Sequence, residues 1–109
     1  MMNQVILVGR ITEDFKDFKT LDNSGTLIKV AVTRSYKNSY GEFETDILPV
    51  VLYGTIAENT VKYCKQGDVV GVKGSLILDV YQGKKALYVK GEKITFLSPK
   101  SPKDDEDEE

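Results

Sequence analysis

The sequence predicts a small all-β domain, a five-stranded barrel of the oligonucleotide-binding class with one short helix between its third and fourth strands. Two observations predict it. Apolar and β-branched residues form strand-length runs that glycines interrupt, and one stretch, residues 55–67, has helical spacing instead. A partly open Greek-key barrel with long loops accommodates such a lone helix. A different small β-barrel and an α+β sandwich are also compatible with the pattern.

Two strands and a turn are expected in the first third of the chain. Residues 4–10 form the first strand and are apolar on both faces. One face would line the barrel, and either a second subunit or another part of the same chain would cover the other. Residues 12–17 are a polar, weakly patterned continuation, and residues 21–26 contain the Asn, Ser and Gly of a turn. Residues 27–34 then alternate as a half-buried strand that ends at Arg34.

A strand and a helix follow in the middle of the chain. Residues 45–53 are rich in apolar and β-branched side chains, and Gly54 ends this run. Residues 55–67 have helical spacing, and Gly67 after a lysine-bearing turn is the expected stop. The predicted buried face of the helix consists of Ala57, Thr60, Val61 and Cys64.

The barrel is expected to close with a long hairpin. Residues 68–80 form one long strand, or two strands joined at Gly74. A turn at residues 81–85 leads into the closing strand at residues 86–97, in which Gly91 predicts a bulge.

Aromatic and basic side chains gather at the two hairpin tips. They are Arg34, Tyr36, Lys37 and Tyr40 around the first tip, and Tyr81, Lys84 and Lys85 around the second. Rings that lie open to solvent can stack on nucleic-acid bases while neighbouring cations neutralise phosphates, and neither contact depends on base sequence. In the alternative interpretation, the tyrosines shield the barrel ends and the lysines keep the tips soluble.

The composition argues against several classes of activity. The sequence has no histidine, which removes the usual general bases and most zinc ligands. Its carboxylates are scattered as on a solvated surface, so we expect no enzyme, no metal and no cofactor. A single cysteine, Cys64, cannot form an internal disulfide, which favours a reducing, cytoplasmic compartment. No apolar run of about 18 residues is present to cross a membrane.

Charge is distributed unevenly along the chain. Residues 1–103 contain 15 basic and 11 acidic side chains, a net charge of +4, whereas residues 104–109 are all acidic. A mildly basic domain joined to an acidic run is unusual for a cytosolic enzyme. Because the composition also changes at Ser98, we expect a domain at residues 1–98 and a disordered acidic tail at residues 99–109.

Three segments give the chain a resemblance to a known family. They are residues 3–10 (NQVILVGR), residues 30–36 (VAVTRSY) and residues 45–54 (TDILPVVLYG) with 56–58, and Tyr63, Gly67, Gly74 and Leu76 continue the match. In these segments the chain resembles the bacterial-type single-stranded DNA-binding proteins over about residues 2–98. The resemblance implies sequence-nonspecific binding and protection of single-stranded DNA in replication, recombination and repair. Priming and recombination relatives share the fold, so the alternative is a primosome or recombination accessory protein that acts mainly through protein contacts.

The resemblance also implies the DNA-contacting positions. The family's stacking aromatics fall on Tyr36, on Tyr53 and on Tyr81. A fourth falls on Ile47, which has no π system, so we expect a weaker contact there. The basic residues expected on the same face are Lys29, Arg34, Lys37, Lys65, Lys73, Lys84 and Lys85.

Partners follow from the same resemblance. A homotetramer is usual in the family, and a dimer is also compatible. Family members often end in an acidic segment tipped by a short hydrophobic peptide that recruits replication and repair proteins. Here the acidic run reaches Glu109 without an apolar tip, so the chain departs from that recruitment motif. The acidic run is expected instead to compete with DNA for the basic surface.

Overall fold

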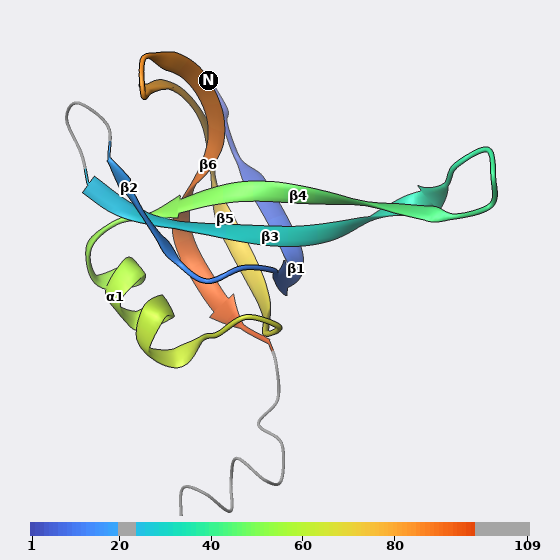
Figure 1. Cartoon of the computed structure of the whole chain (residues 1–109), viewed down its shortest axis with the longest axis horizontal. Coiled ribbons are helices and arrows are strands. Elements are labelled where there is room, and N and C mark those ends of the chain that lie inside the picture. The colour runs from blue at the N-terminus through green and yellow to red at the C-terminus, as the bar shows by residue number, and fades with distance from the viewer. Residues whose placement is uncertain (20–23, 98–109) are drawn as a thin grey trace, which may run out of the picture.

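A computed structural model describes residues 1–19 and 24–97 of the chain (Figure 1). Its elements are β1 (Val5–Ile11), β2 (Lys16–Lys19), β3 (Ser24–Lys37), β4 (Phe43–Leu52), α1 (Gly54–Tyr63), β5 (Val69–Tyr81) and β6 (Lys84–Phe96). Of the predicted turn at residues 21–26, only residues 24–26 are described, and they belong to β3. The predicted tail at residues 99–109 lies outside the described residues.

Five of the strands close a barrel. They are neighbours in the order β1–β5–β6–β4–β3, and β3 returns to β1 through the pairs Arg10–Ala31 and Ile11–Val30. The strands are antiparallel except for β4 and β6, which run parallel. This arrangement confirms the predicted five-stranded barrel with one short helix.

The short strand β2 changes the place of the helix in the strand count. The sequence pattern treats residues 12–17 as a continuation of the first strand, whereas β2 pairs separately with β3, from Lys16–Leu27 to Lys19–Ser24. The helix therefore lies between β4 and β5. Counting the barrel strands alone, it still follows the third.

The main core fills the barrel. The aliphatic side chains of Ile28, Val30, Val50, Leu52, Val70 and Val72 are at most 1% exposed. Burial of such a side chain contributes about 1.5–3 kcal/mol. Because successive residues of a strand point to opposite faces, the same strands present a second set of side chains on the outside of the barrel.

Helix α1 covers one end of the barrel (Figure 1). It begins at Gly54, whose φ of 61° ends β4 as the sequence predicts. The helix ends at Tyr63, earlier than the expected stop, because Cys64 is already extended, with φ of −120° and ψ of 156°. Gly67, with φ of 96°, instead forms the turn that precedes β5. No helix within residues 1–19 and 24–97 has the length and apolarity needed to cross a membrane.

The buried face of α1 differs from the prediction at one position. Ala57, Thr60 and Cys64 are buried as expected, but Val61 is 48% exposed. One residue further along a helix rotates the side chain by about 100°. Val61 therefore points away from the core that Thr60 contacts, and Ile56 packs partly against that core instead.

Two long hairpins extend from the barrel. Beyond Ala31, β3 pairs only with β4, and residues 32–46 form a two-stranded arm that projects to one side (Figure 1). The other hairpin joins β5 and β6 through Gln82 and Gly83, whose φ values of 51° and 79° suit a tight turn between twisted strands.

Strand β5 is continuous through Gly74, which resolves the choice between one strand and two. Its pairing with β6 shifts register where Lys73–Lys93 gives way to Gly74–Gly91. The bulge predicted at Gly91 is therefore confirmed.

The outer face of β1 is open. Ile6 is 70% exposed and Val8 is 56% exposed. The sequence left open whether a second subunit or another part of the same chain covers this outer face. No part of residues 1–19 and 24–97 covers it, so the second interpretation is wrong for the described chain.

Candidate nucleic-acid interface

Four aromatic rings lie on the outside of the barrel, over β2, β4, β5 and β6. We call Phe18, Tyr53, Tyr81 and Tyr88 the aromatic face; they pack over Val51 in a cluster separate from the main core. Strand alternation explains their position. Tyr88 is one residue out of step with the inward-facing Val89, so its ring points outward.

The rings of the aromatic face hold one another in place. Phe18 stacks on Tyr81 with a centroid distance of 4.5 Å and an interplanar angle of 9°, and it meets Tyr88 edge-on at 5.1 Å. Phe18 and Tyr88 are buried, whereas Tyr53 and Tyr81 are half-buried. Tyr53 and Tyr81 therefore combine a packed side with a part of the ring that stays accessible.

A glycine allows Tyr53 to approach the sheet closely. A Cβ atom on Gly25 of β3 would lie 2.7 Å from Cε1 of Tyr53, which is too close for any side chain at that position. On the same face the ammonium of Lys90 lies 5.9 Å from the centroid of the Tyr53 ring. A cation and an accessible π face therefore lie side by side.

A surface groove of about 380 Å³ lies next to Tyr53 and Tyr88. Its lining residues are Ser24, Tyr53, Ile77, Asp79, Tyr88 and Lys90. The Tyr88 hydroxyl donates to Oδ2 of Asp79 at 3.5 Å. Burial, followed by the neighbouring Tyr53 and Asp79, raises the pKa of Tyr88 above its ordinary value, so this hydroxyl remains a donor at neutral pH.

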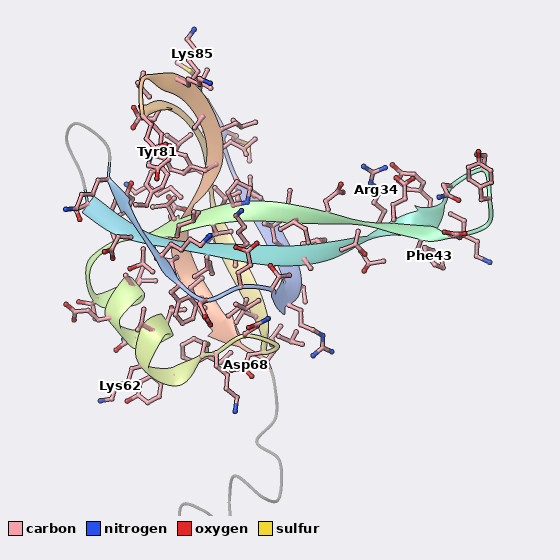
Figure 2. The ribbon with its side chains drawn as sticks, in the orientation of Figure 1. Arg34, Phe43, Lys62, Asp68, Tyr81 and Lys85 are labelled. Atoms are coloured by element: carbon pink, nitrogen blue, oxygen red, sulfur yellow. The ribbon has the colours of Figure 1, made fainter. Side chains whose placement is uncertain are left out.

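The arm carries a second group of rings. Tyr36, Tyr40 and Phe43 are 64%, 85% and 53% exposed. Lys37 lies over the Phe43 ring, with its ammonium 5.7 Å from the centroid. Figure 2 shows Phe43 toward the tip of the arm and Tyr81 over the barrel, so the two groups of rings are well separated.

Arg34 is engaged within the arm. Its Nε and Nη2 donate to the two carboxylate oxygens of Asp46 at 3.0 and 2.9 Å, and its Nη1 donates to Glu44 at 2.6 Å. The hydrogen bonds with Asp46 raise the pKa of Arg34 and lower that of Asp46. Both carboxylates lie on β4 and Arg34 lies on β3, so the cluster ties the two strands of the arm together.

The other predicted site residues fall in different places. Ile47 is 49% exposed at the base of the arm, opposite Ala31. Lys29 lies on the outer face of β3, with its ammonium 3.9 Å from Glu13. Lys84 and Lys85 are exposed at the β5–β6 tip and, within the described part of the chain, take part in no ion pair (Figure 2).

Two predicted lysines lie apart from the aromatic face. Lys65 follows α1, where its backbone N–H donates to Asp68, near the end of the barrel opposite Lys85 (Figure 2). Lys73 pairs with Ile6 across β1 and β5 and lines a different surface hollow from that beside Tyr53.

Four residues of this surface were not predicted from the sequence: Phe18, Asp79, Tyr88 and Lys90. Tyr88 and Lys90 alternate with Leu87 and Val89 in the closing strand, and this alternation could have placed them on the outer face. Phe18 had no such signal, because β2 is only four residues long.

Among the described residues, Cys64 is a candidate nucleophile and the acidic side chains are candidate metal ligands. Burial, followed by Asp68, raises the pKa of Cys64 to about 11, so this thiol is protonated and a poor nucleophile. Among the described residues, no three His, Cys, Asp or Glu side chains are grouped so that they could hold a metal ion.

The sequence is similar to known proteins over almost its whole described length. It matches the single-strand binding protein family over residues 2–97. Single-stranded DNA-binding protein 1 of Clostridium acetobutylicum is 38% identical over 106 residues, which cover 91% of this chain and 96% of that protein. Single-stranded DNA-binding protein B of Bacillus subtilis is 36% identical over 107 residues, which cover 92% and 94%.

Two crystal structures share the fold. The small single-stranded DNA-binding protein of Streptomyces coelicolor has a TM-score of 0.65 at 20% identity, with 88% of this chain and 94% of that chain covered. A deletion mutant of the single-stranded DNA-binding protein of Thermus aquaticus has a TM-score of 0.69 at 23% identity, with 89% and 51% covered. The sequence match and the barrel agree, and the chain belongs to the single-strand binding protein family.

Proposed function

We propose that this chain binds and protects single-stranded DNA during replication, recombination and repair, with bases stacked on the aromatic face and on the rings of the arm. The observation that carries the proposal is the position of Tyr53 and Tyr81, which lie on the outside of the barrel beside lysines rather than in its core. Each stacked base would contribute about 1–3 kcal/mol irrespective of its identity. Family membership and the names of the relatives support the same function.

Some of the cations would contact DNA phosphates, whereas Arg34 would stabilise the arm. Lys84 and Lys85 at the β5–β6 tip, and Lys90 beside Tyr53, are the best placed to neutralise phosphates. Arg34 would act through the arm, because two carboxylates already neutralise it. Tyr36 and Ile47 would contact bases along the arm, Ile47 through its apolar surface alone.

Titration with oligo-dT and with a matched duplex at several salt concentrations tests this function. Tyrosine fluorescence supplies the signal, since the chain has no tryptophan. We expect tighter binding of the single strand and an affinity that falls as salt rises. Equal affinity for both nucleic acids would contradict the proposal and favour an accessory protein that acts mainly through protein contacts.

A homotetramer, built from dimers, is the second part of the proposal. Ile6 and Val8 form an exposed apolar patch on β1, and Leu76, Leu78 and Leu87 form another on the β5–β6 hairpin, with exposures of 46%, 64% and 60%. Apolar surface of this kind usually marks an interface. A second copy of the chain is its proposed occupant, because β1 has an inner face that packs on the barrel core and also presents Ile6 and Val8 on its outer face.

Sedimentation of the intact protein tests the assembly. Ile6→Glu should lower the molecular mass in solution, because a carboxylate in the interface would be desolvated without a partner. Val61→Glu is the matched control, since Val61 is also exposed and apolar but lies on α1. A monomeric wild-type protein, or an Ile6→Glu variant of unchanged mass, would contradict this part of the proposal.

A further inference from the structure

The groove beside the aromatic face has a lining that contains a carboxylate as well as apolar side chains. Stacking of bases does not require that carboxylate. Tyr53 supplies accessible ring surface, and the buried Tyr88 and the half-buried Ile77 complete the apolar part of the lining, but Asp79 places a carboxylate in it. A negative charge opposes a polyanion, so electrostatics alone would exclude an acidic residue from this position. A carboxylate in the groove is instead suited to accept hydrogen bonds from a ligand group that has N–H donors.

The carboxylate of Asp79 is fixed in orientation and still has acceptor capacity. Its Oδ1 accepts from the backbone N–H of Val80 at 2.7 Å, and its Oδ2 accepts from the Tyr88 hydroxyl at 3.5 Å. An ionised carboxylate has about four lone-pair sites. Two protein contacts therefore hold it in place and leave sites for a ligand.

The sheet register arranges the groups around Tyr88. Asp79 is paired with Ala86 and Ser75 with Lys90, so the carboxylate and the ammonium lie on opposite sides of the Tyr88 ring along β6. A base stacked on the accessible part of the Tyr53 ring would present one edge toward Asp79. Lys90 remains available for the phosphate backbone.

We propose that this groove holds a single nucleobase and that Asp79 makes it favour a base with an exocyclic amino group over thymine. This inference rests on the proposed binding of single-stranded DNA. The amino groups of cytosine and adenine donate, whereas thymine presents its O4 acceptor at the corresponding position, and a carboxylate repels an acceptor. Binding along the rest of the strand stays sequence-tolerant, because only one contact in each chain discriminates.

Asp79→Asn tests the inference with little change of shape. The asparagine oxygen keeps one acceptor, and its amide adds a donor that suits thymine. Affinities are measured for oligo-dC and oligo-dT of equal length at mildly alkaline pH, where cytosine stays neutral. The ratio of the dC affinity to the dT affinity should fall by about fivefold in the variant.

Glu58→Gln is the matched control, because it also removes one negative charge but lies exposed on α1. It should leave the ratio unchanged. A ratio that Asp79→Asn also leaves unchanged would overturn the inference. Failure of the wild-type protein to bind either single strand would instead overturn the proposed function.

A second measurement uses only the wild-type protein and therefore does not depend on the folding of a variant. An oligo-dT that contains one cytosine per bound chain should bind more tightly than oligo-dT alone, because sliding can bring the cytosine into the groove. Equal affinity for the two oligonucleotides would overturn base selection at Asp79.

Discussion

At the scale of single residues, Arg34 shows how a charge that looks available in the sequence is already neutralised by the fold. Its guanidinium lies between Asp46 and Glu44, and the amide of Asn38 donates to the other oxygen of Glu44 at 3.3 Å. The cluster reaches from the middle of the arm to its turn. Arg34 therefore contributes to the shape of the arm, and the cations that we propose contact DNA lie elsewhere.

The salt dependence of binding separates these two roles. Lys85→Gln should reduce the slope of log affinity against log salt by about 0.7, the contribution of one phosphate contact on a single strand. Arg34→Gln should leave that slope unchanged. Binding isotherms at several salt concentrations check both variants, and a reduced slope for Arg34→Gln would show that Arg34 contacts phosphate after all.

Cys64 permits a second prediction at this scale. Burial holds its pKa at about 11, above the ordinary value of 9.0, so almost no thiolate exists at neutral pH. We expect a thiol-specific alkylating reagent to label Cys64 far more slowly in the native protein than in denaturant. The extent of labelling is measured by mass spectrometry, and rapid labelling without denaturant would place the thiol at the surface.

At the scale of elements, two glycines on neighbouring strands differ in what surrounds them. A Cβ on Gly9 of β1 would collide with the backbone oxygen of Ala31, where β1 meets β3 and closes the barrel. A Cβ on Gly71 of β5 would find its nearest neighbours at 3.5 Å or more, an ordinary contact. Close approach of two backbones therefore makes glycine necessary at position 9 but not at position 71.

Unfolding experiments can measure this difference. Gly9→Ala should lower the free energy of unfolding by about 2 kcal/mol or more, because the seam between β1 and β3 must separate. Gly71→Ala should change it by about 0.5 kcal/mol or less. Similar losses for the two variants in chemical denaturation would contradict this account of barrel closure.

The rings of the arm and of the barrel should respond differently to truncation. Tyr36→Ala should weaken single-strand binding by about 1–3 kcal/mol with an unchanged melting temperature, because Tyr36 is 64% exposed. Tyr81→Ala should lower both affinity and stability, since Tyr81 also stacks on Phe18. Titrations and thermal melts of both variants check the pair, and an unchanged melting temperature for Tyr81→Ala would mean that the stack adds little.

Local sequence pattern predicted the elements well and their contacts poorly. Alternation and glycine positions placed the barrel strands and the start of α1, because these signals lie within a few residues of one another. The stacking of Phe18 on Tyr81 and the pairing of Arg34 with Asp46 depend on strand register, which brings together residues distant in sequence. The helix stop was misplaced because Gly67 serves a later turn.

At the scale of the whole molecule, positive and negative charge are concentrated in different parts of the chain. Residues 1–103 carry a net charge of +4 and residues 104–109 carry −6. Opposite charges within one chain attract at low ionic strength, and salt screens that attraction over about 10 Å at 0.1 M. We therefore expect the acidic residues to compete with DNA phosphates for the basic side chains of the domain.

Removal of residues 104–109 should accordingly tighten single-strand binding at low salt and have little effect at high salt. Affinities of the full chain and of the shortened chain, measured in parallel across a salt series, check this prediction. A full-length variant in which six neutral serines replace residues 104–109 controls for length. Identical affinities for all three proteins at low salt would rule out the competition.

The length of the arm affects how binding should depend on the length of an oligonucleotide. Strand β4 runs ten residues from Phe43 to Leu52, about 33 Å at the usual rise per strand residue, and Tyr53 follows directly. An oligonucleotide too short to bridge that span can engage either Phe43 or Tyr53 but never both. Affinity plotted against oligonucleotide length should therefore show a threshold, with a shallow rise below it and a sudden gain once a single molecule reaches from the projecting hairpin to the barrel.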